Sequence, residues 1–166
     1  MTEDFVRSLG RAFLAHRLRR ASELILEGSA EALRDFGVAA PTRAGSTLLL
    51  LRAHGPTGIT EIAFRLRLSH PLIIRLTDAL VGEGLVRAEA DPEDQRRRLV
   101  ALTPKGEAEA ARLEAFSQAL ARAFERMFAE TGADLFAAIE RFEAVAEARP
   151  IADRIAAELA QMPAAS

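Results

Sequence analysis

Three consecutive arginines, Arg96, Arg97 and Arg98, are the residues of this sequence whose type and spacing most directly suggest chemistry. They follow a short acidic segment that contains Asp91 and Asp94, and the whole stretch reads DPEDQRRR. Arginines on a narrow loop suit the minor groove of DNA, where the negative potential is strongest in A·T-rich stretches. Asp94 can hold one guanidinium in a bidentate pair and fix its direction. We therefore predict that the three arginines contact DNA and that Asp94 has a structural role beside them.

A second set of candidate contacts lies on the helix predicted from the segment SHPLIIRLTDALVGEGL. Ile73, Leu76 and Leu80 step by three and four residues, so they form its inner, apolar face. The opposite face at the N-terminal end stays free, and a helix with such a face can enter the major groove. Hydrogen-bond donors and apolar side chains that could meet thymine methyl groups occupy it, and we predict these as DNA contacts: Ser69, His70, Pro71, Leu72, Ile74 and Arg75.

The segment TEIAFRLRL directly before this helix predicts a first, shorter helix with Thr60 as its N-cap. Its inner face consists of Ile62, Ala63 and Leu66. Arg67 stands in the turn between the two helices, where a left-handed backbone would strain it by ~1 kcal/mol. Two short helices joined by a tight turn are typical of a helix-turn-helix, so Thr60 is added to the predicted DNA contacts.

Alternating apolar residues then predict two strands, Val86, Ala88 and Ala90 followed by Val100 and Leu102. Strands this short must lean on helices, which places the arginine run at the tip of a hairpin. Thr103 and Pro104 form an N-cap followed by Pro at the first helical position, which opens a long helix over Pro104 to Glu130. This order predicts a mainly α fold with a small β-hairpin wing, with a winged helix-turn-helix over residues 42–106.

The helices on either side of this segment carry more apolar surface than one core requires. A first helix is predicted from Glu3 to Glu27, ended by Gly28, and a short one from Ala30 to Phe36, capped by Ser29. A last helix is expected to begin with Thr131 as its cap, and Pro150 interrupts or kinks it. We expect the surplus stripes to face a partner subunit, so that residues 1–41 and 107–166 form a helical dimerisation region.

Composition narrows the classes of function. The 166 residues carry a net charge of −2, yet ten Lys and Arg face seven Asp and Glu from Arg43 to Lys105, a net +3. A basic segment between acidic flanks predicts salt-sensitive DNA binding. The absence of cysteine excludes disulfides, thiol redox switches and Cys-ligated metals. No apolar run approaches the ~18 residues that span a bilayer, so we expect a cytoplasmic protein without a membrane partner.

No residue pattern supports catalysis. The three histidines lack the spacing of metal ligands, so no metal or other cofactor is expected. The carboxylates of Glu107 and Glu109 have no nucleophile or Gly-rich loop beside them and are interpreted as solvated surface. His16 and His54 could line a pocket for a small molecule, with Arg17 or Arg20 pairing an acidic ligand. The alternative is that both histidines are ordinary, partly buried helix residues.

The segment from Thr42 to Gly106 resembles the MarR family of bacterial transcription regulators. Its marks are the helix pair ITEIAFRLRLSHPLIIRLTDALVGEGLV and a wing similar to D-x-x-D-x-R-x-x-x-V-x-L-T-x-x-G at Asp91, Asp94, Arg96, Val100, Leu102, Thr103 and Gly106. The resemblance implies a homodimer on a palindromic operator, with reading helices about one DNA turn, ~34 Å, apart. It also implies a pocket for a small lipophilic or aromatic ligand whose binding releases the DNA. The sequence departs from the family at Arg67, where Gly is frequent, and at three residues where Ser or Thr is frequent, Pro71, Leu72 and Ile74.

Two functions of different classes remain open. The first is a sequence-specific DNA-binding transcriptional regulator, a repressor in preference to an activator. The second is a winged-helix interaction module that has lost operator binding and docks a partner protein through Leu72 and Ile74. The local basic charge favours the first, and the apolar residues on the reading face favour the second.

Overall fold

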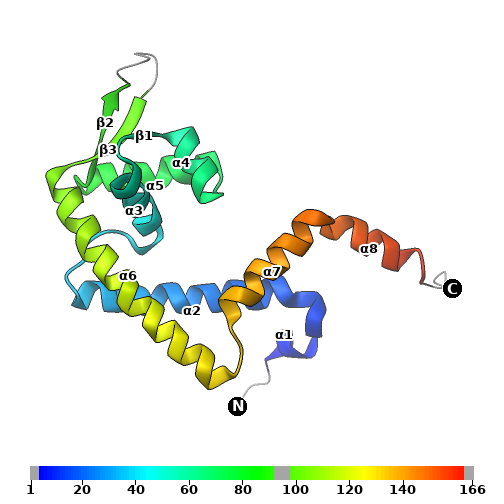
Figure 1. Cartoon of the computed structure of the whole chain (residues 1–166). Helices are drawn as coiled ribbons and strands as arrows, with labels where there is room; N and C mark the ends of the chain where they lie inside the picture. Colours follow the sequence, from blue (N-terminus) through cyan, green and yellow to red (C-terminus); the bar gives the residue numbers. More distant parts are fainter. Residues whose placement is uncertain (1–3, 92–97, 163–166) are drawn as a thin grey trace. The chain divides into compact units, whose positions relative to one another are not determined.

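The computed structural model of the chain describes residues 4–91 and 98–162 (Figure 1). They fall into two compact units, residues 1–118 and residues 119–166. Helices make up most of both units, and a small antiparallel sheet lies in the first. The predicted class, a mainly α fold with a β-hairpin wing, is confirmed.

The N-terminal helices are divided differently from the prediction of one helix over Glu3 to Glu27 and a short one over Ala30 to Phe36. After α1 (Phe5–Ser8) and a 3-10 turn η1 (Gly10–Phe13), helix α2 runs without interruption from Leu14 to Asp35. The predicted end at Gly28 and the cap at Ser29 are therefore wrong. A helical glycine costs only ~1 kcal/mol relative to alanine, and Ser29 and Leu33 are buried against the rest of the unit. Gly37, with a φ of 77°, lies just beyond the C-cap residue Phe36 and closes the last turn of α2.

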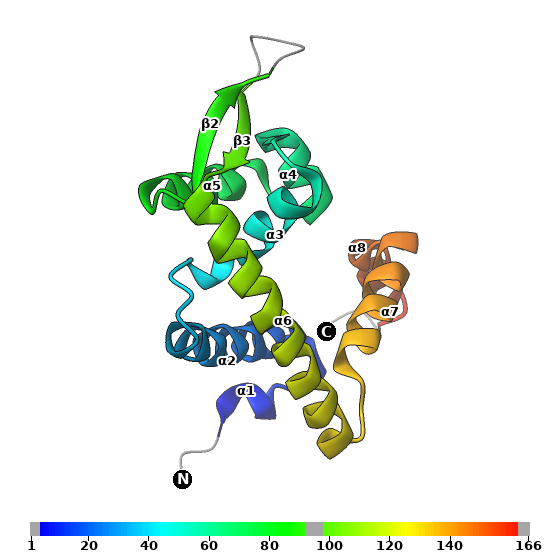
Figure 2. The same ribbon diagram turned by 60° about the vertical axis from the view of Figure 1, so that its left-hand side comes forward.

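The winged helix-turn-helix comprises four helical segments and three strands (Figure 2). In chain order they are η2 (Thr42–Ala44), α3 (Gly45–His54), β1 (Thr57–Gly58), α4 (Ile59–Leu66), α5 (His70–Gly82), β2 (Val86–Ala90) and β3 (Arg98–Leu102). The predicted hairpin is confirmed, since Val86 pairs with Leu102 and Ala88 with Val100. The third strand of the sheet, β1, pairs Thr57 with Val100, which makes β3 the central strand.

The core of this unit is built from the inner faces of α3, α4 and α5. Its fully buried large side chains are Leu48, Leu51, Ile62, Ile73, Leu80 and Leu85. Each such side chain contributes about 1.5–3 kcal/mol when taken out of water. The predicted inner faces are thus confirmed at Ile62, Ile73 and Leu80, while Leu66 and Leu76 are half-buried at the edge.

Three helices follow the sheet. Helix α6 (Pro104–Thr131) begins in the first unit and ends in the second, which also contains α7 (Leu135–Ala148) and α8 (Ile151–Leu159). The predicted cap of α6 is confirmed, because Thr103 Oγ1 accepts the N–H of Gly106 at 3.0 Å. Asp134, and not Thr131, caps α7 and accepts the N–H of Ala137 at 2.9 Å. Thr131 is the last residue of α6, so the side chain of Asp134, three residues later, is the N-cap of α7.

Helices α7 and α8 leave their apolar side chains uncovered within the second unit. More than a third of the surface is accessible in each of these residues: Leu135, Phe136, Ile139, Phe142, Val145, Ile151, Ile155, Leu159 and Met162. Pro150 lies between the two helices, so it interrupts the predicted last helix and does not merely kink it. Across residues 4–91 and 98–162, every helix is too short or too polar to cross a lipid bilayer.

Candidate nucleic-acid interface

The turn between α4 and α5 depends on an unusual backbone conformation at Arg67. Its φ of 51° and ψ of 38° are left-handed, which is the conformation that the sequence analysis associated with strain at this residue. The N–H of Leu68 donates to Ala63 O at 3.0 Å and that of Arg67 to Phe64 O at 3.2 Å, which closes the end of α4. A side chain in this conformation costs ~1 kcal/mol, and it lets α5 start immediately after α4.

The N-terminal end of α5 presents the predicted reading face to solvent. Ser69 is the N-cap residue, and its carbonyl accepts the N–H groups of Leu72 and Ile73 at 3.0 and 3.1 Å. Its hydroxyl makes no capping bond to the helix, so it is available to a ligand. Ser69, His70, Pro71 and Arg75 are exposed, Ile74 is 40% exposed and Leu72 is half-buried.

Thr60 has a different local role from the one expected. Helix α4 begins at Ile59 with Gly58 as its N-cap, so Thr60 lies inside the first turn. The reason is strand β1, whose pairing with β3 delivers an extended Gly58 directly into the helix. The capping role is therefore wrong, although the side chain of Thr60 is exposed and belongs to the helix that precedes the reading helix.

The β2–β3 hairpin extends beyond α3, α4 and α5 in both views of the molecule (Figures 1 and 2). Arg98 is the first residue of β3, is exposed and pairs with Ala90. The other predicted wing residues, Asp94, Arg96 and Arg97, lie outside the described residues. At the base of the hairpin, Arg87 Nη1 donates to Leu102 O at 2.6 Å and Nη2 lies 3.0 Å from Glu89 Oε2.

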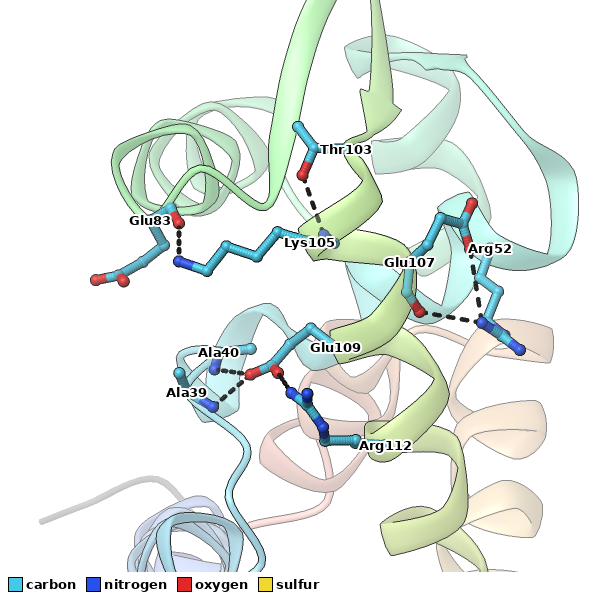
Figure 3. Close-up of polar contacts among 10 residues, drawn as sticks. Ala39, Ala40, Arg52, Glu83, Thr103, Lys105, Glu107, Glu109 and Arg112 are labelled. Atoms are coloured by element: carbon cyan, nitrogen blue, oxygen red, sulfur yellow. Dashed lines mark hydrogen bonds and ion pairs between the residues drawn. The ribbon is translucent and has the colours of Figure 1, made fainter.

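The C-terminal end of the reading helix is bonded to the start of α6 (Figure 3). Thr103 Oγ1 donates to Gly84 O at 2.7 Å, and Lys105 Nζ donates to Glu83 O at 2.6 Å. These carbonyls follow α5 directly, where a cation also complements the helix dipole. Gly106 approaches so closely that a Cβ there would lie 1.9 Å from Leu85 O. The reading helix and α6 are therefore held as one piece at this junction.

Glu109 is buried, which corrects its interpretation as solvated surface. Its side chain is 3% exposed, and Oε1 accepts the N–H groups of Ala39 and of Ala40, the latter at 2.8 Å. Oε2 accepts Arg112 Nη1 at 2.7 Å (Figure 3). The sequence did carry a signal, because Glu109 shares a helical stripe with Gly106, Ala110 and Leu113.

Glu107 is exposed, as interpreted, but it is not without a partner. Its Oε2 lies 3.5 Å from Arg52 Nη1 on α3, and Arg52 Nε lies 3.3 Å from Glu114 Oε2. Exposed pairs of this kind contribute about 0–1 kcal/mol each, so they guide the packing of α3 on α6 only weakly.

The candidate ligand residues His16, Arg20 and His54 lie on two different helices, α2 and α3. His16 is half-buried on α2. Arg20 Nη1 donates to Asp4 Oδ2 at 2.6 Å, and this hydrogen bond, with help from Arg17, lowers the pKa of Asp4 below its ordinary value. His54 ends α3, with its Nδ1 3.3 Å from Arg65 Nη1. Within residues 4–91 and 98–162, no group of three or more His, Asp or Glu side chains forms a metal site.

An exposed helix after a left-handed turn, followed by a hairpin and a long helix, defines a winged helix-turn-helix protein. Residues 43–97 match the model of the MarR family. The match covers about a third of the chain and agrees with the resemblance drawn from the helix pair and the wing. No curated protein matches the sequence at a significant level.

Solved structures extend the similarity beyond the matched segment. The transcriptional repressor CouR, bound to a 23-mer DNA duplex, is 27% identical and aligns with a TM-score of 0.67 over 87% of this chain and 99% of its own. The PcaV transcriptional regulator from Streptomyces coelicolor, in complex with its natural ligand, is 21% identical, with a TM-score of 0.63 over 92% and 99%.

The S. aureus MepR–DNA complex is 20% identical, with a TM-score of 0.61 over 81% of this chain and 94% of its own. PcaV and MepR establish the fold alone. The matched family and CouR are regulators of transcription and not enzymes, in agreement with the absence of a catalytic pattern in the sequence.

Proposed function

We propose that this protein is a sequence-specific DNA-binding transcriptional regulator, and a repressor in preference to an activator. The observation that carries the proposal is the exposed N-terminal face of α5, in a chain 27% identical to a repressor solved on DNA. On this face Ser69, His70 and Arg75 supply hydrogen-bond donors, and Ile74 supplies an apolar contact for a thymine methyl group. Pro71 and Leu72 shape the surface between them, and Thr60 lies on the preceding helix.

The wing is proposed to make the second contact. Arg98, exposed at the start of β3, would reach the phosphates or the minor groove together with Arg96 and Arg97. Asp94 would orient one of these guanidinium groups through a bidentate pair. Because these contacts are to phosphate and groove potential, they should add affinity and salt dependence more than base specificity.

The protein is proposed to act as a homodimer on a palindromic operator, in the cytoplasm. Support comes from large apolar side chains exposed on the helices assigned to residues 1–41 and 107–166, since large exposed apolar surfaces mark interaction sites. In α1, η1 and α2 the exposed set is Phe5, Phe13, Leu14, Leu18, Leu24 and Ile25. Sedimentation at micromolar concentration should give twice the monomer mass of 18.0 kDa, and a monomer would contradict the homodimer.

A small lipophilic or aromatic effector is proposed to release the DNA. Its candidate contacts are His16, Arg20 and His54, of which Arg20 is bonded to Asp4 at 2.6 Å. An acidic effector that pairs with Arg20 would have to compete with the Asp4 carboxylate. Binding must favour a state with the wrong separation of the reading helices, since a ligand shifts an equilibrium only by its preference between states.

The direct test is a mobility-shift assay on the DNA upstream of the protein's own coding sequence. We expect a sequence-selective shift that weakens steeply with salt. Arg75→Ala should reduce affinity by about 1–3 kcal/mol if it contacts a base. Arg19→Ala is the matched control, because Arg19 is also exposed but lies on α2, where its nearest ion pair is to Glu23 at 4.0 Å.

The exposed apolar residues near the reading face keep the interaction module as the second candidate. Phe64, on the outward side of α4, is 78% exposed, and Ile74 is 40% exposed. If no genomic fragment is shifted at low salt, this candidate takes the place of the regulator, and a Phe64→Ser, Ile74→Ser double variant should lose capture of its partner protein.

A further inference from the structure

We propose that Glu109 is a positioning residue whose carboxylate holds the connection between α2 and the winged domain and thereby sets the spacing of the two reading helices. The inference rests on the proposed function, a homodimer that reads two half-sites. In this proposal, one side chain of α6 determines which half-site spacing the dimer accepts.

The carboxylate contacts the connection at two successive main-chain groups. Helix α2 ends at Asp35 and η2 begins at Thr42, so residues 36–41 join them. Glu109 Oε1 accepts the N–H of Ala39 and that of Ala40, while Oε2 is held by Arg112 Nη1 at 2.7 Å (Figure 3). Two adjacent donors that converge on one oxygen fix both the position and the direction of this connection.

The burial of Glu109 shows that this contact does more than fill space. The side chain is 3% exposed, and a buried carboxylate is costly unless it is hydrogen-bonded and paired. An apolar side chain would fill the same volume without that cost, but it would leave the N–H of Ala40 without its acceptor in a residue that is 7% exposed. The charge is therefore explained by the main-chain donors that it satisfies.

The same helix holds the reading helix a few residues away. Thr103 and Lys105, at the start of α6, are bonded to the carbonyls that follow α5. Further along α6, the ring of Phe116 lies 6.1 Å from that of Phe36 at the end of α2. Glu109 lies between these two junctions, so it determines where α2 leaves the winged domain relative to the reading helix. If α2 belongs to the dimer frame, this direction decides how far apart two reading helices lie.

The decisive experiment compares half-site spacings. Duplexes are first selected by the wild-type, full-length protein from a random-sequence library, and the spacing between the half-sites is then changed by one and two base pairs. Each added base pair moves a half-site by ~3.4 Å and rotates it by ~36°, so the wild type should prefer one spacing roughly tenfold or more. We expect Glu109→Ala to reduce this preference to about threefold or less, with affinity for the best duplex falling less than the preference does.

Glu109→Gln separates the two halves of the contact. Its amide oxygen can still accept from Ala39 and Ala40, but the charge pair with Arg112 is lost. We expect Gln to retain most of the spacing preference. Glu114→Ala and Glu114→Gln are the matched controls, because Glu114 lies on the same helix with an exposed pair to Arg52 and should leave the preference unchanged.

An unchanged spacing preference in Glu109→Ala would overturn the inference while leaving the proposed function intact. Failure of the wild type to select any duplex would instead contradict the proposed function. Amide exchange tests the contact of Glu109 without DNA. Exchange at Ala39 and Ala40 should accelerate roughly tenfold or more in Glu109→Ala but little in Glu109→Gln. Equal exchange in the two variants would also overturn the inference.

Discussion

Gly106 and Leu85 approach each other so closely that a Cβ on Gly106 would lie 1.9 Å from the Leu85 carbonyl oxygen. Leu85 directly follows the turn that ends the reading helix, and its carbonyl also accepts the N–H of Thr103 at 3.0 Å. Backbone therefore meets backbone where α6 starts. This contact explains why the wing pattern ends in glycine, since any side chain there would push α6 away from the reading helix.

Gly106→Ala should destabilise the protein by about 1–3 kcal/mol or more, because the added methyl group meets main-chain atoms that have no rotamer to change. Urea unfolding followed by circular dichroism measures the change. Gly82→Ala is the control, because Gly82 lies in α5 with nothing within 4 Å of its ideal Cβ. That substitution should be neutral or stabilise by up to about 1 kcal/mol. Equal stability of the two variants would contradict the close approach.

The left-handed turn at Arg67 predicts a reversal of the usual order of alanine and glycine. Arg67→Gly and Arg67→Ala both remove the side chain and its contacts, so their difference isolates the backbone cost. We expect Gly to be more stable than Ala by about 1 kcal/mol here. At Arg65, inside α4, we expect Ala to be more stable than Gly by a similar amount. Thermal unfolding of the four variants gives both differences, and the same sign at both positions would argue against a strained turn.

The apolar reading face predicts a contact with a thymine methyl group. Ile74 is 40% exposed whereas its neighbour Ile73 is fully buried, so Ile74→Ala should leave the fold intact. Removing one methyl group from a contact costs ~0.8 kcal/mol, or about fourfold in affinity. Replacing thymine by uracil at the contacted position should therefore weaken wild-type binding about fourfold, and Ile74→Ala should not respond. If the variant is as sensitive as the wild type, the methyl group is read elsewhere.

Asp4 predicts an acid-sensitive attachment of α1 to α2. Its hydrogen bond from Arg20, at 2.6 Å, and the charges of Arg20 and Arg17 hold the pKa of this carboxyl below its ordinary value. Because the folded pKa lies below the unfolded one, the stabilisation is present at neutral pH and is lost as the pH falls through the folded value.

Amide exchange at Val6, whose N–H is bonded to Asp4 Oδ1 at 3.2 Å, reports this attachment. Exchange at this amide should accelerate more steeply below about pH 4 in the wild type than in Asp4→Asn, after correction for intrinsic rates. In Asp4→Asn the ion pairs with Arg17 and Arg20 are absent at every pH, so the same acid response in both proteins would assign the effect to another group.

Patterns within short stretches of sequence were sufficient for much of the fold. The spacing of Ile73 and Leu80 identified the inner face of the reading helix, and alternation identified both strands of the wing, because period and burial are linked within one element. The strain at Arg67 was stated only on the condition that this turn requires a positive φ, and the structure meets that condition with a φ of 51°. The wing residues Asp94, Arg96 and Arg97 remain sequence predictions, together with the roles of the exposed reading face.

Contacts between distant segments were decided by the tertiary structure. Gly28 and Ser29 have the local properties of a helix end, yet packing of the surrounding turns carries α2 through them, since one helical glycine costs only ~1 kcal/mol. Thr57 and Gly58 became a strand because β3, about forty residues further along the chain, offers them partners: Val100 pairs with Thr57 and Leu99 with Gly58. Glu109 is charged, which is typical of a surface residue. Its burial is explained only by the N–H groups of Ala39 and Ala40, which lie far away in the sequence and donate to its carboxylate. A sequence determines the preference of each segment for helix or strand, whereas the partner that satisfies a buried polar group is determined only when the chain folds.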